Sequence, residues 1–336
     1  MKIRNALIGL LFGLFAHPVA AEESVNVYSY RQPFLVEPLF DMFTEQTGIK
    51  VNTVFAKKGL VERLKREGKN SPADLLITSD FNNLNIAVAA DVLQPVSSDV
   101  LTANIPEEFR DTNKLWFGLT NRARLIAISK ERMATDAPER YEDLVDPKYK
   151  GLICTRSGKH NYMVALIASI IAHSGEEAAQ AWLTGVKANL ARTPQGNDRA
   201  QVKAISQGEC DIAIINSYYM GSMLADPEQA AWANSVNLVF PNQSDRGTHM
   251  NISGMGLTKA APNRDNAISL MEFLTSAQAQ RYYADINHEY PVNQSIAASE
   301  LVRSWGEFKY DKQPLSTIAA ERNAASRLVD QVNYDQ

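Results

Sequence analysis

The stretch between residues 25 and 78 decides the fold, and it reads VNVYS (25–29), PFLVEPLFDMFTEQTG (33–48), IKVNTVF (49–55), LVERLKRE (60–67) and ADLLIT (73–78). The first, third and fifth segments have the alternation or the nearly unbroken apolar character of strands. The second segment begins with a proline, which suits the first turn of a helix, and stops at a glycine; the fourth is also helical. This alternation predicts βαβ units and a parallel sheet that is buried on both faces.

Two long extended segments follow, with a second α/β series between them. Residues 115–129 form one extended stretch, broken at Asn121-Arg-Ala-Arg124, and residues 248–258 are again extended and contain glycine. Further elements are predicted as strands at 151–155, 190–193 and 210–216 and as helices at 162–173, 176–189, 198–207, 264–274 and 277–284. We interpret the two extended segments as crossings between two lobes. A chain that crosses more than once builds each lobe from discontinuous pieces, and ligand then binds between the lobes, near strand ends and helix N-termini.

The chain is longer than a single hydrophobic core usually supports, so two lobes are expected. We assign residues 22–121 and 248–295 to a first lobe. Residues 122–247 and 296–336 are assigned to a second lobe with the C-terminal helices.

The first residues have the features of an export signal. Lys2 and Arg4 precede an apolar stretch from residue 6 to residue 16, and Val19-Ala20-Ala21 supplies the small residues that a signal peptidase needs. We therefore expect residues 1–21 to be a signal peptide that is removed near Ala21. The apolar stretch is too short to span a bilayer and no other segment is apolar enough, so no direct membrane insertion is expected.

Charge and cysteine content limit the remaining classes. The formal net charge is −4 at pH 7, a mildly acidic balance that argues against nucleic acid as a partner. The two cysteines, Cys154 and Cys210, can pair in an oxidising compartment or can be two buried small hydrophobes, and their spacing does not decide between these states.

Paired tyrosines, Tyr218 and Tyr219, end an apolar run that starts at Cys210. Two adjacent phenols at a cleft suit a hard metal cation, although an isolated pair of this kind more often packs inside a lobe. Neighbouring residues on a regular strand point to opposite faces, so the strand must bend or end at Tyr218 if both phenols grip one ion. Met220-Gly221 is consistent with that break, and residues 220–225 are expected to begin a short helix.

Eight motifs, in chain order over essentially the whole mature chain, carry a family resemblance: YSYR (28–31), KGLV (58–61), SPAD (71–74), WFGLTNRAR (116–124), DPKYKG (146–151), RSGK (156–159), NSYY (216–219) and HEYPV (288–292). Together they resemble the ferric-ion-binding periplasmic proteins of ABC-type iron importers. The resemblance implies a type II periplasmic binding protein, an α/β fold of two lobes joined by crossing hinge strands with ligand in the interlobe cleft.

The resemblance also implies that Tyr162, Tyr218 and Tyr219 bind the metal. Fe(III) is small, hard and highly charged, so it favours anionic oxygen donors over sulfur. A phenol has a pKa near 10, but a bound trication favours the phenolate strongly enough to expel its proton. Binding should therefore release protons and weaken as pH falls.

Three phenolates leave open coordination positions on an octahedral ferric ion. The resemblance implies that a carbonate-like anion fills these positions. Arg122 is the first candidate to hold carbonate or bicarbonate and Arg124 the second, because a guanidinium donates two parallel hydrogen bonds to a planar oxyanion. Either arginine taken singly could instead form an interlobe salt bridge. Asn161 is a further candidate donor to the anion.

One departure from part of the family concerns the first lobe. Several relatives carry His-Tyr where this chain has Gln32 and Pro33, and neither of these is a credible ferric ligand. This argues for a three-tyrosine subtype. The residues expected to line or border the cleft without binding the metal are Tyr30, Arg31, Gln32, His160 and Tyr290.

The resulting hypothesis is a periplasmic, monomeric binding protein that delivers Fe(III) to the permease of an ABC transporter in the inner membrane. It is not expected to be an enzyme. Two alternatives remain: another cargo, such as a polyamine or an oxyanion, and a cleft enzyme that uses Cys154 as nucleophile. Polyamine binding calls for cleft carboxylates, and a reactive thiol needs a partly exposed, electropositive setting.

Overall fold

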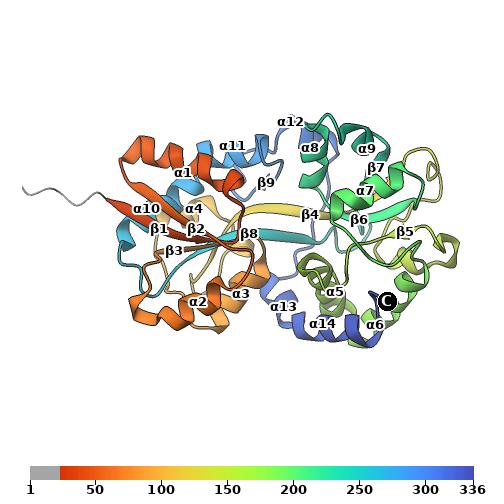
Figure 1. Ribbon diagram of the computed structural model, residues 1–336, viewed down its shortest axis with the longest axis horizontal. Helices are drawn as coiled ribbons and strands as arrows, with labels where there is room; N and C mark the ends of the chain where they lie inside the picture. Colours follow the sequence, from red (N-terminus) through yellow and green to blue (C-terminus); the bar gives the residue numbers. More distant parts are fainter. Residues whose placement is uncertain (1–22) are drawn as a thin grey trace, which may run out of the picture.

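The computed structural model describes residues 23–336, so the predicted signal peptide at residues 1–21 lies outside the described residues. Two α/β lobes lie side by side, and two long strands run between them (Figure 1): β4 (Phe117–Ser129) and β8 (Met250–Leu257). The two predicted crossings are thereby confirmed. No helix in the range 23–336 is long and apolar enough to cross a membrane.

The βαβ units predicted from residues 25–78 are confirmed. Strand β1 (Ser24–Ser29) pairs in parallel with β2 (Lys50–Phe55) on one side and with β3 (Leu75–Thr78) on the other. The intervening helices are α1 (Pro33–Thr47) and α2 (Leu60–Glu67). Helix α1 ends where Gly48 takes φ +77°, a left-handed conformation that glycine adopts without steric cost.

One sheet path runs through both lobes in the order β2-β1-β3-β8-β4-β6-β5, and β7 and β9 also pair with β4. The additional strands are β5 (Ile153–Cys154), β6 (Ile212–Asn216), β7 (Val236–Val239) and β9 (Tyr290–Pro291). Residues 117–123 of β4 pair with β8, whereas residues 124–128 pair with β6. The predicted break at 121–124 is wrong, because the backbone finds ladder partners on both sides of this point and the strand continues.

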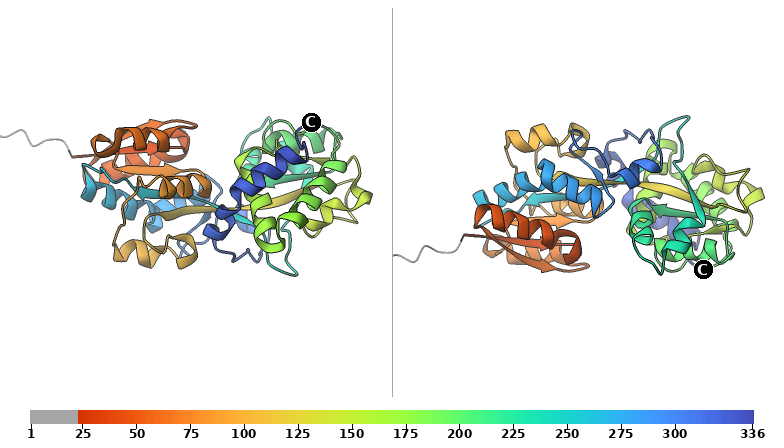
Figure 2. Two further views of the ribbon diagram at one scale, coloured as in Figure 1. Left: turned by 90° about the horizontal axis from the view of Figure 1, so that it is seen from below. Right: turned by 90° about the horizontal axis from the view of Figure 1, so that it is seen from above.

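Helices cover the sheet in both lobes, and the rest are α3 (Phe81–Ala89), α4 (Asp99–Asn104), α5 (Asn161–Ser174), α6 (Glu176–Ala188), α7 (Asp198–Ser206), α8 (Tyr218–Leu224), α9 (Ala230–Asn234), α10 (Arg264–Leu274), α11 (Ala277–Asp285), α12 (Glu300–Ser304), α13 (Leu315–Ala320) and α14 (Arg322–Gln331). Short 3₁₀ turns lie at Gly68–Asn70, Glu107–Phe109, Glu142–Val145 and Pro147–Tyr149. Seen from below, α13 and α14 run from the junction along the second lobe (Figure 2).

The strand predicted at 190–193 is wrong. Leu190 forms only an isolated bridge to Ile153. Pro194 has no N–H to continue a ladder, and Gly196 turns the chain with φ +70°.

Each lobe has its own hydrophobic core. Val27, Phe43 and Leu75 belong to the first, and Leu166 and Ile212 to the second. Helix α13 touches both, since Ala319 packs in the first core and Ile318 in the second.

A disulfide joins Cys154 in β5 to Cys210, two residues before β6, with Cα atoms 5.9 Å apart. Both cysteines are buried. This settles the state of the cysteines in favour of pairing. It also overturns the alternative of Cys154 as a nucleophile, because no free thiol is left and the residue is not exposed.

Candidate functional site

A cavity of about 150 Å³ lies between the lobes. Its wall combines the β1–α1 connection, the end of β3, the middle of β4, the starts of α5 and α8, and the segment before β9. The lining residues are Tyr30, Arg31, Gln32, Leu35, Ser79, Arg122, Tyr162, Tyr218, Tyr219, Asn287 and Glu289. All three tyrosines singled out in the sequence thus face one space.

The paired tyrosines begin a helix directly after a strand. Strand β6 ends at Asn216, Ser217 already has helical dihedrals (φ −55°, ψ −45°), and α8 starts at Tyr218. The predicted end of the strand is confirmed, but the helix begins two residues earlier than predicted. Successive residues of a helix are about 100° apart, so both side chains can reach the same cavity. Their ring centroids are 4.2 Å apart, with the planes inclined by 30°.

Tyr162 comes from the first turn of α5. Its hydroxyl oxygen lies 3.4 Å from that of Tyr218, and either group can donate. The backbone N–H of Tyr162 donates to Nδ1 of His160 (3.2 Å), which caps the helix, and the two rings meet edge to face at 4.6 Å. His160 therefore positions Tyr162 rather than lining the cavity. Burial, together with the neighbouring Arg156, lowers the pKa of His160 to about 4, so its ring stays a neutral acceptor at neutral pH.

Burial controls the protonation of the tyrosine pair. It raises the pKa of Tyr218 well above its usual value, the neighbouring Tyr162 raises it further, and the Arg122 guanidinium acts in the opposite direction. Burial also raises the pKa of Tyr219. Without a bound cation both groups are neutral hydroxyls at neutral pH, and only a strong positive charge can displace their protons.

Arg122 is the arginine that lines the cavity, and its side chain is only 2% exposed. One terminal nitrogen donates to the carbonyl oxygen of Ser79, and the other lies 3.8 Å from a carboxylate oxygen of Glu289. Its Nε is buried and has no partner among the described residues. The guanidinium lies 5.7 Å from the centre of the Tyr162 ring. Arg122 therefore lines the cavity and keeps one buried donor that no described residue uses.

Arg124 shares the strand face of Arg122 but does not line the cavity. Its Nη1 donates to Asp198 (2.7 Å) and to the side-chain oxygen of Asn216 (3.0 Å). The guanidinium is 5.9 Å from the centre of the Tyr162 ring. Arg124 lies behind Tyr162, in a salt bridge within the second lobe.

Three other predicted residues are occupied elsewhere. The hydroxyl of Tyr30, whose ring lines the cavity, accepts hydrogen bonds from the backbone N–H groups of residues 60 and 61 (2.9 and 3.0 Å). The side chain of Asn161 donates to Asp80 (3.5 Å) and accepts from Arg322 (3.0 Å). Tyr290 packs its ring against Phe308, with centroids 5.3 Å apart, and borders a different surface hollow. Gln32 and Arg31 line the cavity.

Sequence reasoning missed Glu289, which is the single carboxylate among the lining residues. Both oxygens of Glu289 accept from Arg31, at 2.7 and 3.3 Å. Ser79 and Asn287 were missed as well. Glu289 lies inside the HEYPV motif, so the sequence marked this segment. The sequence did not show that Glu289 binds Arg31, which lies 258 positions away.

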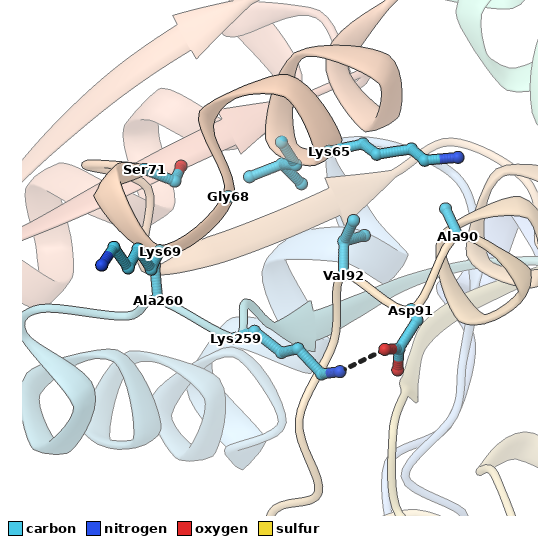
Figure 3. A pocket seen from close by; sticks show the side chains of 10 residues that line it. Lys65, Gly68, Lys69, Ser71, Ala90, Asp91, Val92, Lys259 and Ala260 are labelled. Atoms are coloured by element: carbon cyan, nitrogen blue, oxygen red, sulfur yellow. Dashed lines mark hydrogen bonds and ion pairs between the residues drawn. The ribbon is translucent and has the colours of Figure 1, made fainter.

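Other features of the described chain do not compete for a metal. No group of three histidine, cysteine, aspartate or glutamate side chains within residues 23–336 could hold an ion. A larger cavity of about 490 Å³ lies on the first lobe, beside Lys65, Lys69 and Lys259 (Figure 3). Lys259 is paired there with Asp91, and the cavity contains none of the predicted site residues.

Comparison with known proteins gives consistent matches over almost the whole chain. Iron uptake protein A1 of Synechocystis is 42% identical over 93% of this chain and 88% of its own length. The apo ferric ion-binding protein A of Pasteurella haemolytica is 51% identical, covers 94% of this chain and 99% of its own, and superposes with a TM-score of 0.89. A Trichodesmium protein in complex with iron and citrate is 42% identical, covers 93% and 99%, and has a TM-score of 0.88.

These neighbours have the type II periplasmic binding protein fold, which confirms the predicted architecture. The model of the bacterial extracellular solute-binding proteins matches residues 70–309, well over half of the sequence. The chain belongs to this family of bacterial extracellular solute-binding proteins, and the relatives it resembles include an iron uptake protein and a ferric ion-binding protein.

Proposed function

We propose that this protein captures Fe(III) outside the cytoplasm through the phenolates of Tyr162, Tyr218 and Tyr219 and delivers it to the permease of an ABC importer. The observation that carries the proposal is the approach of the Tyr162 and Tyr218 hydroxyl oxygens to 3.4 Å at a cavity that Tyr219 also lines. The names of the relatives, an iron uptake protein and ferric ion-binding proteins, support the same cargo.

The donor set suits a hard trivalent cation. The cavity offers phenol oxygens and no sulfur, and oxygen donors are those that a hard ion prefers. Burial raises the pKa of Tyr218 and Tyr219, so the metal-free site holds neutral hydroxyls. Fe(III) supplies enough charge to displace these protons, and a weakly charged ligand does not.

A small oxyanion completes the proposed site. Three phenolates leave an octahedral ion with open positions, and Arg122 has a buried Nε without a partner in the described chain. Carbonate or bicarbonate could accept from this guanidinium while binding the metal. The citrate in the Trichodesmium complex is an oxyanion of the same donor class.

The wall disfavours a polyamine as cargo. Polyamine recognition requires carboxylates that are free to bind ammonium groups. Glu289, the single carboxylate in the wall, is already bound at both oxygens by Arg31.

A ferric titration of the purified protein, with and without bicarbonate, tests the proposal. Phenolate-to-iron charge transfer should give a visible absorption band that saturates at one equivalent, and proton release should accompany it. Tyr218→Phe and Tyr219→Phe keep the rings and each remove one donor, so each should weaken the band and the affinity.

The matched control is Tyr149→Phe. Tyr149 is a buried tyrosine of the second lobe whose hydroxyl donates to the carbonyl oxygen of Asp136 (2.7 Å), away from the cavity. It should titrate like the wild type. A protein that stays colourless with excess Fe(III), or a Tyr219→Phe variant with full affinity, would contradict the proposal.

A further inference from the structure

We propose that Asp198 is a positioning residue for the three tyrosines Tyr162, Tyr218 and Tyr219. Its carboxylate holds the strand–helix junction before Tyr218 and two guanidinium groups beside Tyr162. The inference rests on the proposed function, because it gives Asp198 a task at the same ferric site. Asp198 is the first residue of α7 and is fully buried. A helix N-terminus favours a carboxylate, but burying the charge is costly unless ionic partners surround it.

Three donors from three elements converge on this carboxylate. Arg124 in β4 donates to Oδ2 (2.7 Å), and Arg156, which follows β5, donates to Oδ1 (2.8 Å). The backbone N–H of Asn216 donates to Oδ2 (2.8 Å). Asn216 is the last residue of β6 and lies two positions before Tyr218. One side chain therefore ties β4, the loop after β5 and the end of β6 together where α8 begins.

The same carboxylate sets the surroundings of the Tyr162 ring. The guanidinium carbons of Arg124 and Arg156 lie 5.9 and 5.1 Å from the ring centre, within the range of a cation–π contact. Asp198 itself does not line the cavity, so its contacts reach the cavity through the residues that it holds.

No neighbour can replace Asp198 as acceptor. Donors already exceed acceptors here, because Nε and Nη2 of Arg124, Nε of Arg156 and Nδ2 of Asn216 lack partners within residues 23–336. Loss of the carboxylate would leave two buried guanidinium groups without a counter-ion, and they would move. The junction before Tyr218 and the ring of Tyr162 would lose their supports together.

Asp198→Asn tests the inference, with Asp211→Asn as the matched control. Asp211 also pairs with an arginine, Arg132, in the second lobe, but this pair is partly exposed and neither residue lines the cavity. In metal-free protein, hydrogen exchange of the backbone amides at 212–219 should be faster in Asp198→Asn than in the wild type or the control. Ferric affinity should fall by about 10- to 100-fold and the absorption maximum should move, as expected for supports of metal ligands.

The exchange measurement needs no metal, so the two proposals can fail separately. A wild type that does not bind Fe(III) contradicts the proposed function, while the exchange rates still decide whether Asp198 holds the junction. A folded Asp198→Asn protein with wild-type exchange and an unmoved absorption maximum overturns the role of Asp198.

If Asp198→Asn does not fold, Arg156→Gln replaces it. This variant leaves the carboxylate bound to Arg124 and to the Asn216 amide. We expect unchanged exchange at 212–219 but a moved absorption maximum, because one of the cations beside Tyr162 is gone. An unmoved maximum would again overturn the positioning role.

Discussion

The imidazole of His288 packs directly on Gly221, so a residue that precedes β9 in the first lobe touches the helix that carries the tyrosine pair. A Cβ added at Gly221 would collide with the ring and would lie 2.6 Å from the Cβ of His288. The flanking residues Asn287 and Glu289 both line the cavity. Contact between the two lobes thus depends on the absence of a side chain at one position of α8.

Gly221→Ala should therefore weaken ferric binding several-fold, because the added methyl group pushes the 287–289 segment away from the cavity. It should also reduce the free energy of unfolding by about 1–3 kcal/mol, as overpacking does. Competition with a chelator and urea unfolding measure the two effects.

A double-mutant cycle provides the control for Gly221→Ala. Combining it with His288→Ala removes the colliding ring, so affinity should return toward that of His288→Ala alone. Strictly additive effects of the two changes would show that the contact is not responsible.

Arg122→Lys should remove most of the dependence of ferric affinity on bicarbonate. Lysine keeps the charge but loses the planar fork that binds an oxyanion at two points. The measurement is a ferric titration with and without bicarbonate. Arg264→Lys, at an exposed position of α10, serves as control, and an unchanged bicarbonate response in Arg122→Lys would argue against the assigned role.

Ferric affinity should rise with pH. The metal-free hydroxyls of Tyr218 and Tyr219 are protonated because burial raises their pKa, and binding requires their protons to leave. Each proton released makes affinity about tenfold stronger per pH unit while the free group stays protonated. Tyr219→Phe should reduce the slope of log affinity against pH by about one, and a slope equal to that of the wild type would exclude proton loss from Tyr219.

Replacing both cysteines, Cys154→Ala with Cys210→Ala, should lower the free energy of unfolding by about 2–5 kcal/mol. The bridge closes a loop between residues separated by 56 positions and ties β5 to the start of β6. The stoichiometry of ferric binding should stay at one, because neither sulfur lines the cavity. Urea unfolding of the variant and of the wild type, oxidised and reduced, measures the effect.

Local pattern predicted most of the secondary structure. The bounds of α2 at 60–67 and of α10 at 264–274 agree with the prediction, since apolar spacing and chain-breaking residues act within one or two turns. The strand at 190–193 failed because Pro194 and Gly196 end the extended backbone. Continuity of β4 through 121–124 was missed because it depends on β8 and β6, which are distant in sequence.

The site was predictable where a motif marked it and not where long-range pairing created it. Tyr218 and Tyr219 stood within the NSYY motif and Tyr162 followed the RSGK motif by three residues, and the cavity brings all three together. Asp198 lay in no motif, and Glu289 lay in the HEYPV motif without any sign of what it binds. Their partners lie up to 258 residues away along the chain, so only the folded arrangement reveals what they hold.

The order of strands also governs how the polypeptide can be assembled and dismantled. Strand β3 has β8 as its neighbour, and in β4 residues 120 and 121 lie between β8 and β9, yet both β8 and β9 are synthesised after residues 122–247 of the second lobe. A nascent chain that has emerged only as far as residue 247 therefore has an unfinished first sheet. The first lobe can therefore complete its fold only after most of the second lobe has been synthesised. For the same reason, a protease would have to cut the chain at least twice to separate the lobes.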